Sequence, residues 1–372
     1  ELYLKFLYEY FKEEINQDED LNESYRPDNF KTLKYQEHAV INAKRIINMY
    51  GGVFISDVVG LGKTYMGTML YQELGGSTLI IAPPHLIDEN NPGSWENAFA
   101  DFGFRSRDYR CSSKGIIEQI ANKKEYERFD TILIDEAHYY RNEDTSSFTH
   151  LHTICKNKKV ILVTATPFNN KHKDLYSLIK LFQPTRNSNI PGLSNIENFF
   201  NTMARNLDRA KKISSEEYLE VFKKNAKQVR ERILKHIMVR RTRQEVQEFY
   251  RKDLEAQGVK FPKLVDPKPI YYEFGNKENI TFDDTLHILT RIFNFARYRP
   301  LDYLTDQGKL KTIDKTRESN ITKFIKILLI KRLESSSYAF KKTIGRVIES
   351  YKIFIEQYKS GTIYISKKNI KK

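Results

Sequence analysis

The sequence predicts an α/β fold, in which a parallel sheet is flanked by helices and mostly helical subdomains are added. Short apolar runs alternate with helical stretches between residues 52 and 167. The runs are continuous rather than alternating in polarity, as expected for strands that are covered on both faces. Strands and helices repeated in this order build parallel sheets with right-handed crossovers.

Four strands are expected, at Val53–Ser56, Thr78–Ala82, Thr131–Ile134 and Val160–Val163. A helix should precede the first strand, because apolar residues recur there at helical spacing. They include Ala39, Val40, Ala43, Ile46 and Ile47. In sheets of this kind, ligands bind beyond the carboxyl ends of the strands. Functional side chains are therefore expected at those ends.

Composition narrows the class of protein. With 40% hydrophobic and 30% charged residues, the chain reads as a soluble globular protein, and it has no apolar run long enough to cross a bilayer. Only two cysteines are present, which favours a reducing, cytoplasmic location. The lack of a long apolar run is the reason to expect no membrane partner. A formal charge of +14 is expected of a protein that binds the polyphosphate backbone of a nucleic acid, although a well-solvated surface would explain it equally well.

The first chemical motif lies where the first strand runs into a glycine-punctuated loop. Gly60 and Gly62 let the backbone turn its N–H groups toward one point, and a helix N-terminus follows, so the loop can bind an anion. Lys63 adds a mobile charge for the outer phosphates of ATP, and the Thr64 hydroxyl can bind Mg²⁺. The usual first glycine of such loops is replaced by Asp57. The predicted ATP-binding residues here are Asp57, Val58, Val59, Gly60, Leu61, Gly62, Lys63 and Thr64.

The second motif is a pair of carboxylates at the end of the third expected strand. Asp135 is assigned to Mg²⁺ and Glu136 to orienting and deprotonating the attacking water. Together with Lys63 they form the predicted catalytic set. A third motif, Thr164-Ala165-Thr166-Pro167, ends the next strand, where its hydroxyls can hydrogen-bond to the acidic strand end.

These three motifs resemble motifs I, II and III of superfamily 2 helicases, with Asp135–His138 reading as the DEAH box. Within that group the chain resembles the SWI/SNF-type ATPases, especially their bacterial relatives, over roughly residues 30–275. Further support comes from Asp174–Leu178 and from Val239–Val246. The resemblance implies a RecA-like lobe and assigns adenine recognition to Gln36. It assigns coupling between the motifs to His138, Thr164, Ala165 and Thr166.

The sequence departs from the family pattern at Val58, where an acid is common, and at Ala165, which replaces glycine. It also contains no Gln-x-x-Gly-Arg-x-x-Arg segment, which supplies the arginines of the second lobe in the family. The 372 residues are therefore expected to bind Mg·ATP but to hydrolyse it poorly on their own.

The residue pattern, together with the resemblance, predicts how the chain is divided. Residues 1–30 should form an N-terminal helix and linker, 31–184 the RecA-like ATP-binding lobe, and 185–262 a helical protrusion that returns to this lobe. Within the protrusion, Ser214 and Glu217 offer a capping box for a long helix. Residues 263–372 should begin a second, incomplete lobe with a helical insertion, starting with a strand at Pro269–Phe274.

The implied partner is the backbone of double-stranded DNA, bound without sequence readout. Contacts are expected from Pro83, Pro84 and His85 and from a basic region that includes Arg240 and Arg241. The basic region is equally compatible with an ordinary solvated helix face. An RNA helicase remains an alternative because the motifs do not separate the two polymers. A nucleotide-gated scaffold without turnover is another, although Glu136 argues against it.

Overall fold

The computed structural model describes residues 26–27, 30–31, 33–58, 60–166, 172–262, 265–271, 273, 275–293 and 312–361. Most of the predicted N-terminal helix and linker, together with Val59 and Pro167, lies outside the described residues. The chain divides into two compact units, Glu1–Lys263 and Leu264–Lys372.

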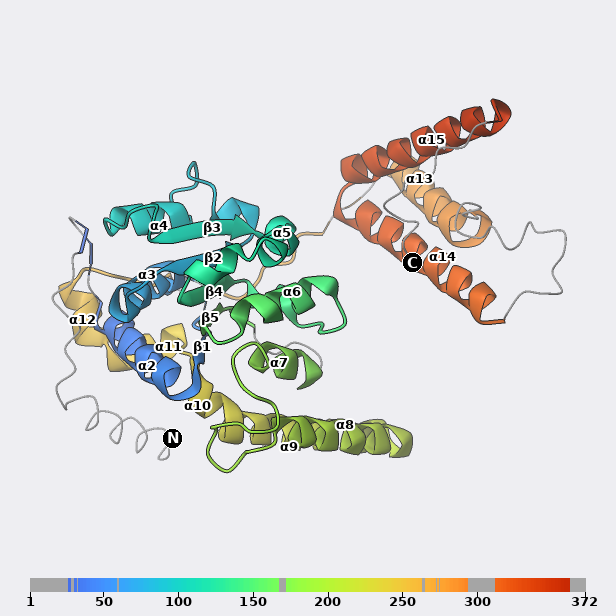
Figure 1. The fold of residues 1–372 in the computed structure, drawn as a ribbon. Coiled ribbons are helices and arrows are strands. Elements are labelled where there is room, and N and C mark those ends of the chain that lie inside the picture. The colour runs from blue at the N-terminus through green and yellow to red at the C-terminus, as the bar shows by residue number, and fades with distance from the viewer. Residues whose placement is uncertain are drawn as a thin grey trace. The chain divides into compact units, whose positions relative to one another are not determined.

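In its described part, the first unit is built on a six-stranded sheet in which every neighbouring pair is parallel. The strand order is β3-β2-β4-β5-β1-β6, and Figure 1 labels the first five of these strands in that order. The strands are β1 Gly52–Ile55, β2 Thr78–Ala82, β3 Tyr109–Ser113, β4 Thr131–Asp135, β5 Lys159–Val163 and β6 Met238–Val239. The α/β class is thus confirmed, and the four predicted strands appear within one residue of their expected bounds.

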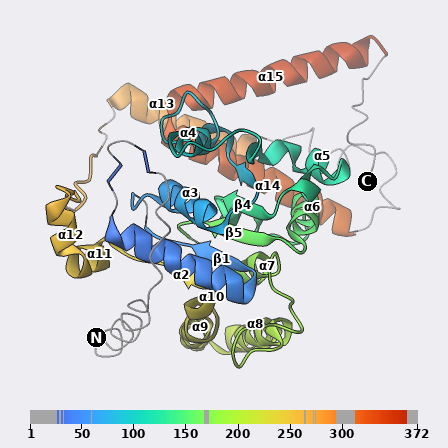
Figure 2. The ribbon, with the colours of Figure 1, turned by 60° about the vertical axis from the view of Figure 1, so that its left-hand side comes forward.

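Helices cover both faces of this sheet, as Figures 1 and 2 show. One face is covered by α2 Lys34–Tyr50, α3 Lys63–Leu74 and α4 Trp95–Asp101, and the other by α5 Ile117–Asn122, α6 Ser146–Cys155 and α7 His172–Ile179. Side chains of each strand alternate between the two apolar clusters, because successive strand residues point to opposite faces. In β4, for example, Ile132 packs on the α5–α6 side and Leu133 on the α2–α4 side. This two-sided burial accounts for the continuous apolar runs in the sequence.

A helical excursion separates α7 from β6. It contains α8 Ile196–Ile213, α9 Ser215–Val229, a π-helical turn at Arg230–Leu234 and α10 Lys235–Ile237. The Ser214 hydroxyl accepts the Glu217 N–H at 3.0 Å at the start of α9, which is the Ser214 half of the predicted capping box. The chain then returns to the sheet as β6, which pairs with β1 and is followed by α11 Arg243–Phe249 and α12 Arg251–Ala256.

The described part of the second unit is helical, with α13 Asn276–His287, α14 Thr312–Ser335 and α15 Ser337–Lys359. The strand predicted at Pro269–Phe274 is wrong for the described residues, since 269–271 and 273 form no strand. The prolines at 267 and 269 remove two backbone donors there. None of the described helices of either unit is long and apolar enough to span a membrane.

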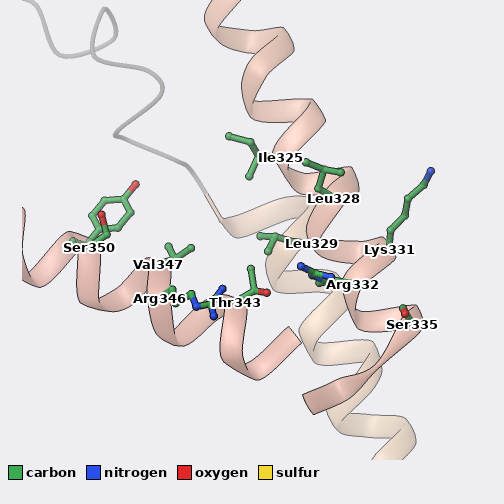
Figure 3. A pocket seen from close by; sticks show the side chains of 11 residues that line it. Ile325, Leu328, Leu329, Lys331, Arg332, Ser335, Thr343, Arg346, Val347 and Ser350 are labelled. Atoms are coloured by element: carbon green, nitrogen blue, oxygen red, sulfur yellow. The ribbon is translucent and has the colours of Figure 1, made fainter. Parts of the chain in front are cut away.

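Helices α14 and α15 pack around Leu329 and enclose a groove of about 790 Å³ (Figure 3). Its lining combines apolar side chains such as Ile325 and Val347 with three cationic ones, Lys331, Arg332 and Arg346. None of the predicted site residues lines this groove.

Candidate functional site

The loop after β1 has the backbone that the glycine pattern predicts. Gly60 and Gly62 adopt φ of +87° and +81°, in the left-handed region that favours glycine. A side chain at either position would also displace the end of a neighbouring side chain. A Cβ on Gly60 would lie 2.8 Å from a guanidinium nitrogen of Arg243, and one on Gly62 would lie 2.5 Å from Nε2 of Gln36.

Helix α3 begins directly after this loop, at Lys63 and Thr64. The first N–H groups of a helix have no partner within the helix and carry partial positive charge, so this end of α3 can bind an anion. Lys63 adds a full charge, and its Nζ donates to the backbone carbonyl of Asp57 at 3.1 Å. The loop is further fixed by Tyr35 and Gln36 of α2, whose side chains both donate to the Leu61 carbonyl at 3.1 Å.

Asp57 has a structural partner that sequence reasoning missed. Its carboxylate is fully buried and forms an ion pair with the guanidinium of Arg241, while the Arg241 N–H donates to Asp57 Oδ1 at 2.8 Å. The Val58 N–H in turn donates to the Arg241 carbonyl at 3.2 Å. Arg241, just after β6, therefore fixes the start of the loop at Asp57 and Val58. Arg241, expected on a nucleic-acid surface, is directed inward instead.

The predicted acids lie at the carboxyl end of β4. Asp135 is 9% exposed, and burial raises the pKa of its carboxyl, opposed by hydrogen bonds from the Trp95 indole and the Glu136 N–H. Those two bonds measure 2.8 Å and 2.7 Å and reach different carboxylate oxygens. Glu136 has φ of +50°, an uncommon backbone conformation for a residue other than glycine. Such residues cluster at functional sites.

The loop and the acids share one edge of the sheet. β1 and β4 both pair with β5, so their carboxyl ends lie on either side of the same strand. The positive charge of Lys63 also acts to lower the pKa of Asp135, which requires the two side chains to lie near each other. The Thr64 hydroxyl and the Asp135 carboxylate are oxygen ligands, the type that Mg²⁺ prefers.

The third motif contacts the second. His138 Nδ1 lies 3.0 Å from Glu136 Oε2 and 3.3 Å from Thr164 Oγ1. The same threonine hydroxyl accepts the Thr166 N–H at 3.3 Å. The His138 imidazole thus contacts both Glu136, the predicted general base, and Thr164 at the end of β5. Ala165, between the two threonines, is partly exposed.

The residues predicted to contact nucleic acid differ in their exposure to solvent. Pro84 and His85 are exposed and Pro83 is partly exposed, in a short 3₁₀ turn after β2. Arg240 is also exposed. Only Arg241 is withdrawn from the surface, by its pairing with Asp57.

Two family models match the sequence. The SNF2-related domain matches residues 111–300, just over half of the chain, and the res subunit of type III restriction enzymes matches residues 29–169.

Several curated relatives are named helicases. The chain is similar to the uncharacterized ATP-dependent helicase YqhH of Bacillus subtilis, at 26% identity over 40% of this chain and 29% of the relative. It is also similar to the ATP-dependent helicase fft3 of Schizosaccharomyces pombe, at 25% identity over 43% of this chain and 20% of the relative. The probable ATP-dependent DNA helicase CHR23 of Arabidopsis thaliana shows 25% identity over 54% of this chain and 20% of the relative.

The chain spans less than a third of the length of these relatives. Among solved structures, the SWI2/SNF2 ATPase core of Sulfolobus solfataricus in complex with dsDNA matches with a TM-score of 0.44 and 19% identity. That match covers 77% of this chain and 57% of the other. The predicted resemblance to SWI/SNF-type proteins is confirmed by the family model, and the chain belongs to the SNF2-related family.

Proposed function

We propose that the chain is part of an ATP-dependent motor that moves along double-stranded DNA, binding Mg·ATP and hydrolysing it to ADP and phosphate. The observation that carries this proposal is the meeting of the Gly60–Thr64 loop and the Asp135–Glu136 strand end at one edge of the sheet. Membership of the SNF2-related family supports it, as do relatives named ATP-dependent helicases.

Each part of the site has a role in this proposal. The loop amides and Lys63 hold the phosphates, and Gln36 faces the adenine once its amide leaves the loop. Thr64 and Asp135 bind Mg²⁺, which neutralises the charge that develops on the phosphates. Glu136 accepts the proton of the attacking water, and the neighbouring His138 nitrogen, 3.0 Å from its Oε2, fixes the direction of the carboxylate.

DNA is the proposed track. Exposed residues of the turn after β2, Pro84 and His85, and the exposed Arg240 contact the phosphate backbone without reading bases. The relative named a DNA helicase supports DNA over RNA.

Turnover by the 372 residues alone should be slow. Their sequence holds no Gln-x-x-Gly-Arg-x-x-Arg segment, and an arginine that reaches the transferred phosphate from across a cleft contributes about 10³–10⁵ in rate.

The test compares Glu136→Gln with Glu118→Gln, an exposed acid on α5. Binding of a fluorescent, non-hydrolysable ATP analogue should be unchanged in both variants. ATP hydrolysis in the presence of duplex DNA should fall about 10²–10⁴-fold in Glu136→Gln only, because general-base catalysis is lost. Unimpaired hydrolysis in Glu136→Gln, or a wild-type chain that binds no nucleotide, would overturn the proposal. Stimulation by RNA but not by DNA would instead favour an RNA helicase.

A further inference from the structure

We infer that Trp95 is a positioning residue that orients the Asp135 carboxylate and connects it to the phosphate-binding helix α3. The inference deepens the proposed function and rests on it. Nothing in the motifs assigns a role to Trp95, since it lies forty residues before the acid that it contacts.

The first step is the contact with the acid. Trp95 Nε1 donates to Asp135 Oδ2 at 2.8 Å, and the Glu136 N–H donates to Asp135 Oδ1 at 2.7 Å. Each carboxylate oxygen thus has its own donor, and these two bonds fix the rotation of the carboxylate plane. Trp95 is 1% exposed, so water does not compete for its N–H. The indole therefore controls which oxygen lone pairs of Asp135 stay available to a cation.

The second step is the seat of the indole on α3. A Cβ built on Gly67 would lie 2.6 Å from Trp95 Cη2 and 3.4 Å from Leu133 Cδ1 of β4. The indole therefore occupies the volume that a side chain at position 67 would need. Gly67 follows Lys63 by about one helical turn. A displacement of the phosphate-binding end of α3 thus reaches Asp135 through one rigid ring.

The third step is that the ring is held by its own helix rather than by the acid. Ser94 caps α4, its hydroxyl accepting the Asn97 N–H at 3.2 Å. The Asn97 side chain donates to the Asn91 and Glu89 carbonyls at 2.7 and 2.8 Å, which fixes the preceding loop. Phe99 packs beside Trp95, with ring centroids 6.3 Å apart. Removal of the indole N–H should therefore leave the packing of α4 intact.

A purely structural tryptophan would affect only stability, whereas a residue that orients a metal ligand affects metal binding. Loss of such an outer hydrogen bond usually costs about 10–100-fold in metal affinity. Trp95→Phe removes the N–H and keeps an aromatic ring. Phe102→Leu is the matched control, because Phe102 is a buried ring at the C-terminal end of the same helix that packs against Phe30 and Tyr65.

Both variants of the full 372-residue chain are titrated with Mg²⁺ at a fixed concentration of a fluorescent ATP analogue. The Mg²⁺ concentration at half-saturation should rise about 10–100-fold in Trp95→Phe and stay at the wild-type value in Phe102→Leu. Analogue binding in EDTA should not distinguish Trp95→Phe from wild type. An equal Mg²⁺ requirement in wild type and Trp95→Phe, or an equal rise in both variants, would overturn the inference.

Intrinsic fluorescence gives a second readout, because Trp95 is the only tryptophan of the chain. Addition of Mg²⁺ to the nucleotide-bound wild type should change the indole emission, and the change should be lost in Asp135→Asn. A wild type that binds nucleotide with no Mg²⁺-dependent change in emission contradicts the role of Trp95 and leaves the proposed function standing. If the wild-type chain binds no nucleotide, the proposed function itself is contradicted, and the inference fails with it.

Discussion

The two units of the chain differ in how much apolar surface they bury. In the first unit, Glu1–Lys263, large clusters close both faces of the sheet, and side chains such as Phe54 are fully buried. In the described part of the second unit, the apolar cluster contains two buried residues, Leu289 and Leu329, while Phe324 is 61% exposed. Because apolar burial is the main favourable term in folding, the first unit has the core needed to hold a precise site.

The units differ in charge as well. Residues 264–372 carry 22 Lys and Arg against 12 Asp and Glu, whereas residues 1–263 carry 40 against 36. Most of the excess of +14 therefore belongs to the second unit, although the basic region singled out in the sequence lies in the first. In the first unit a key cation, Arg241, is paired and 14% exposed. The excess of positive charge thus lies mainly in the second unit, whereas the motifs lie in the first.

The largest effect should come from the core of the first unit. Phe54→Ala should lower the free energy of unfolding by about 3–5 kcal/mol, because it leaves a cavity between β1 and the helices on the α5–α7 side of the sheet. Phe324→Ala, its counterpart in the second unit, should change stability by less than about 1 kcal/mol, since the ring is mostly exposed. Urea unfolding followed by far-UV circular dichroism reports the helices of both units, and Trp95 emission reports the first unit alone. Equal shifts for both variants would remove the contrast between the units.

The next effect concerns charge. Arg241→Met leaves the buried Asp57 carboxylate unpaired and should lower the free energy of unfolding by about 3 kcal/mol, the low end for breaking a buried ion pair. Arg332→Met, on the exposed wall of the groove in the second unit, should cost less than about 0.5 kcal/mol. The same unfolding experiment measures both. A neutral Arg241→Met would show that the pair does not anchor the loop.

The smallest effect per residue is a pH dependence of the first unit. Burial lowers the pKa of four histidines there, His38, His152, His172 and His236, below the ordinary value of 6.5. Below about pH 6.5 the unfolded state binds protons that the folded histidines resist, so the free energy of unfolding falls as pH falls. Each histidine contributes at most about 1.4 kcal/mol per pH unit.

Unfolding at pH 7.5 and pH 5.5 checks this sign. His172→Gln should flatten the dependence, because His172 is 5% exposed, and His287→Gln, an exposed position in the second unit, should leave it unchanged. Stability that stays constant or rises on acidification would contradict the prediction.

Most strands of the first unit could be predicted from the sequence, because burial on both faces makes them continuous apolar runs. Two strands escaped detection for physical reasons. β3, Tyr109–Ser113, lies at the edge of the sheet and contains Arg110 and two serines, so it shows no continuous apolar run. β6 has only two residues, Met238 and Val239, which is too short for any periodicity.

The site was predicted at the level of motifs and missed at the level of contacts. The glycine loop and the acidic strand end each carry a local pattern of residues. The bond from Trp95 to Asp135 and the pair of Arg241 with Asp57 instead join positions 40 and 184 residues apart. Such pairings depend on how the sheet brings segments together, and no local spacing reports them.

The most direct test of the central claim, that loop and acids form one nucleotide site, is equilibrium binding of a fluorescent ATP analogue with and without Mg²⁺. Lys63→Ala should weaken binding about 10–100-fold, as for loss of a hydrogen bond to a charged group, and Asp135→Asn should abolish the gain that Mg²⁺ provides. Lys123→Ala, an exposed lysine after α5, should bind as the wild type does. Wild-type affinity in Lys63→Ala, with the Mg²⁺ gain intact in Asp135→Asn, would contradict the account.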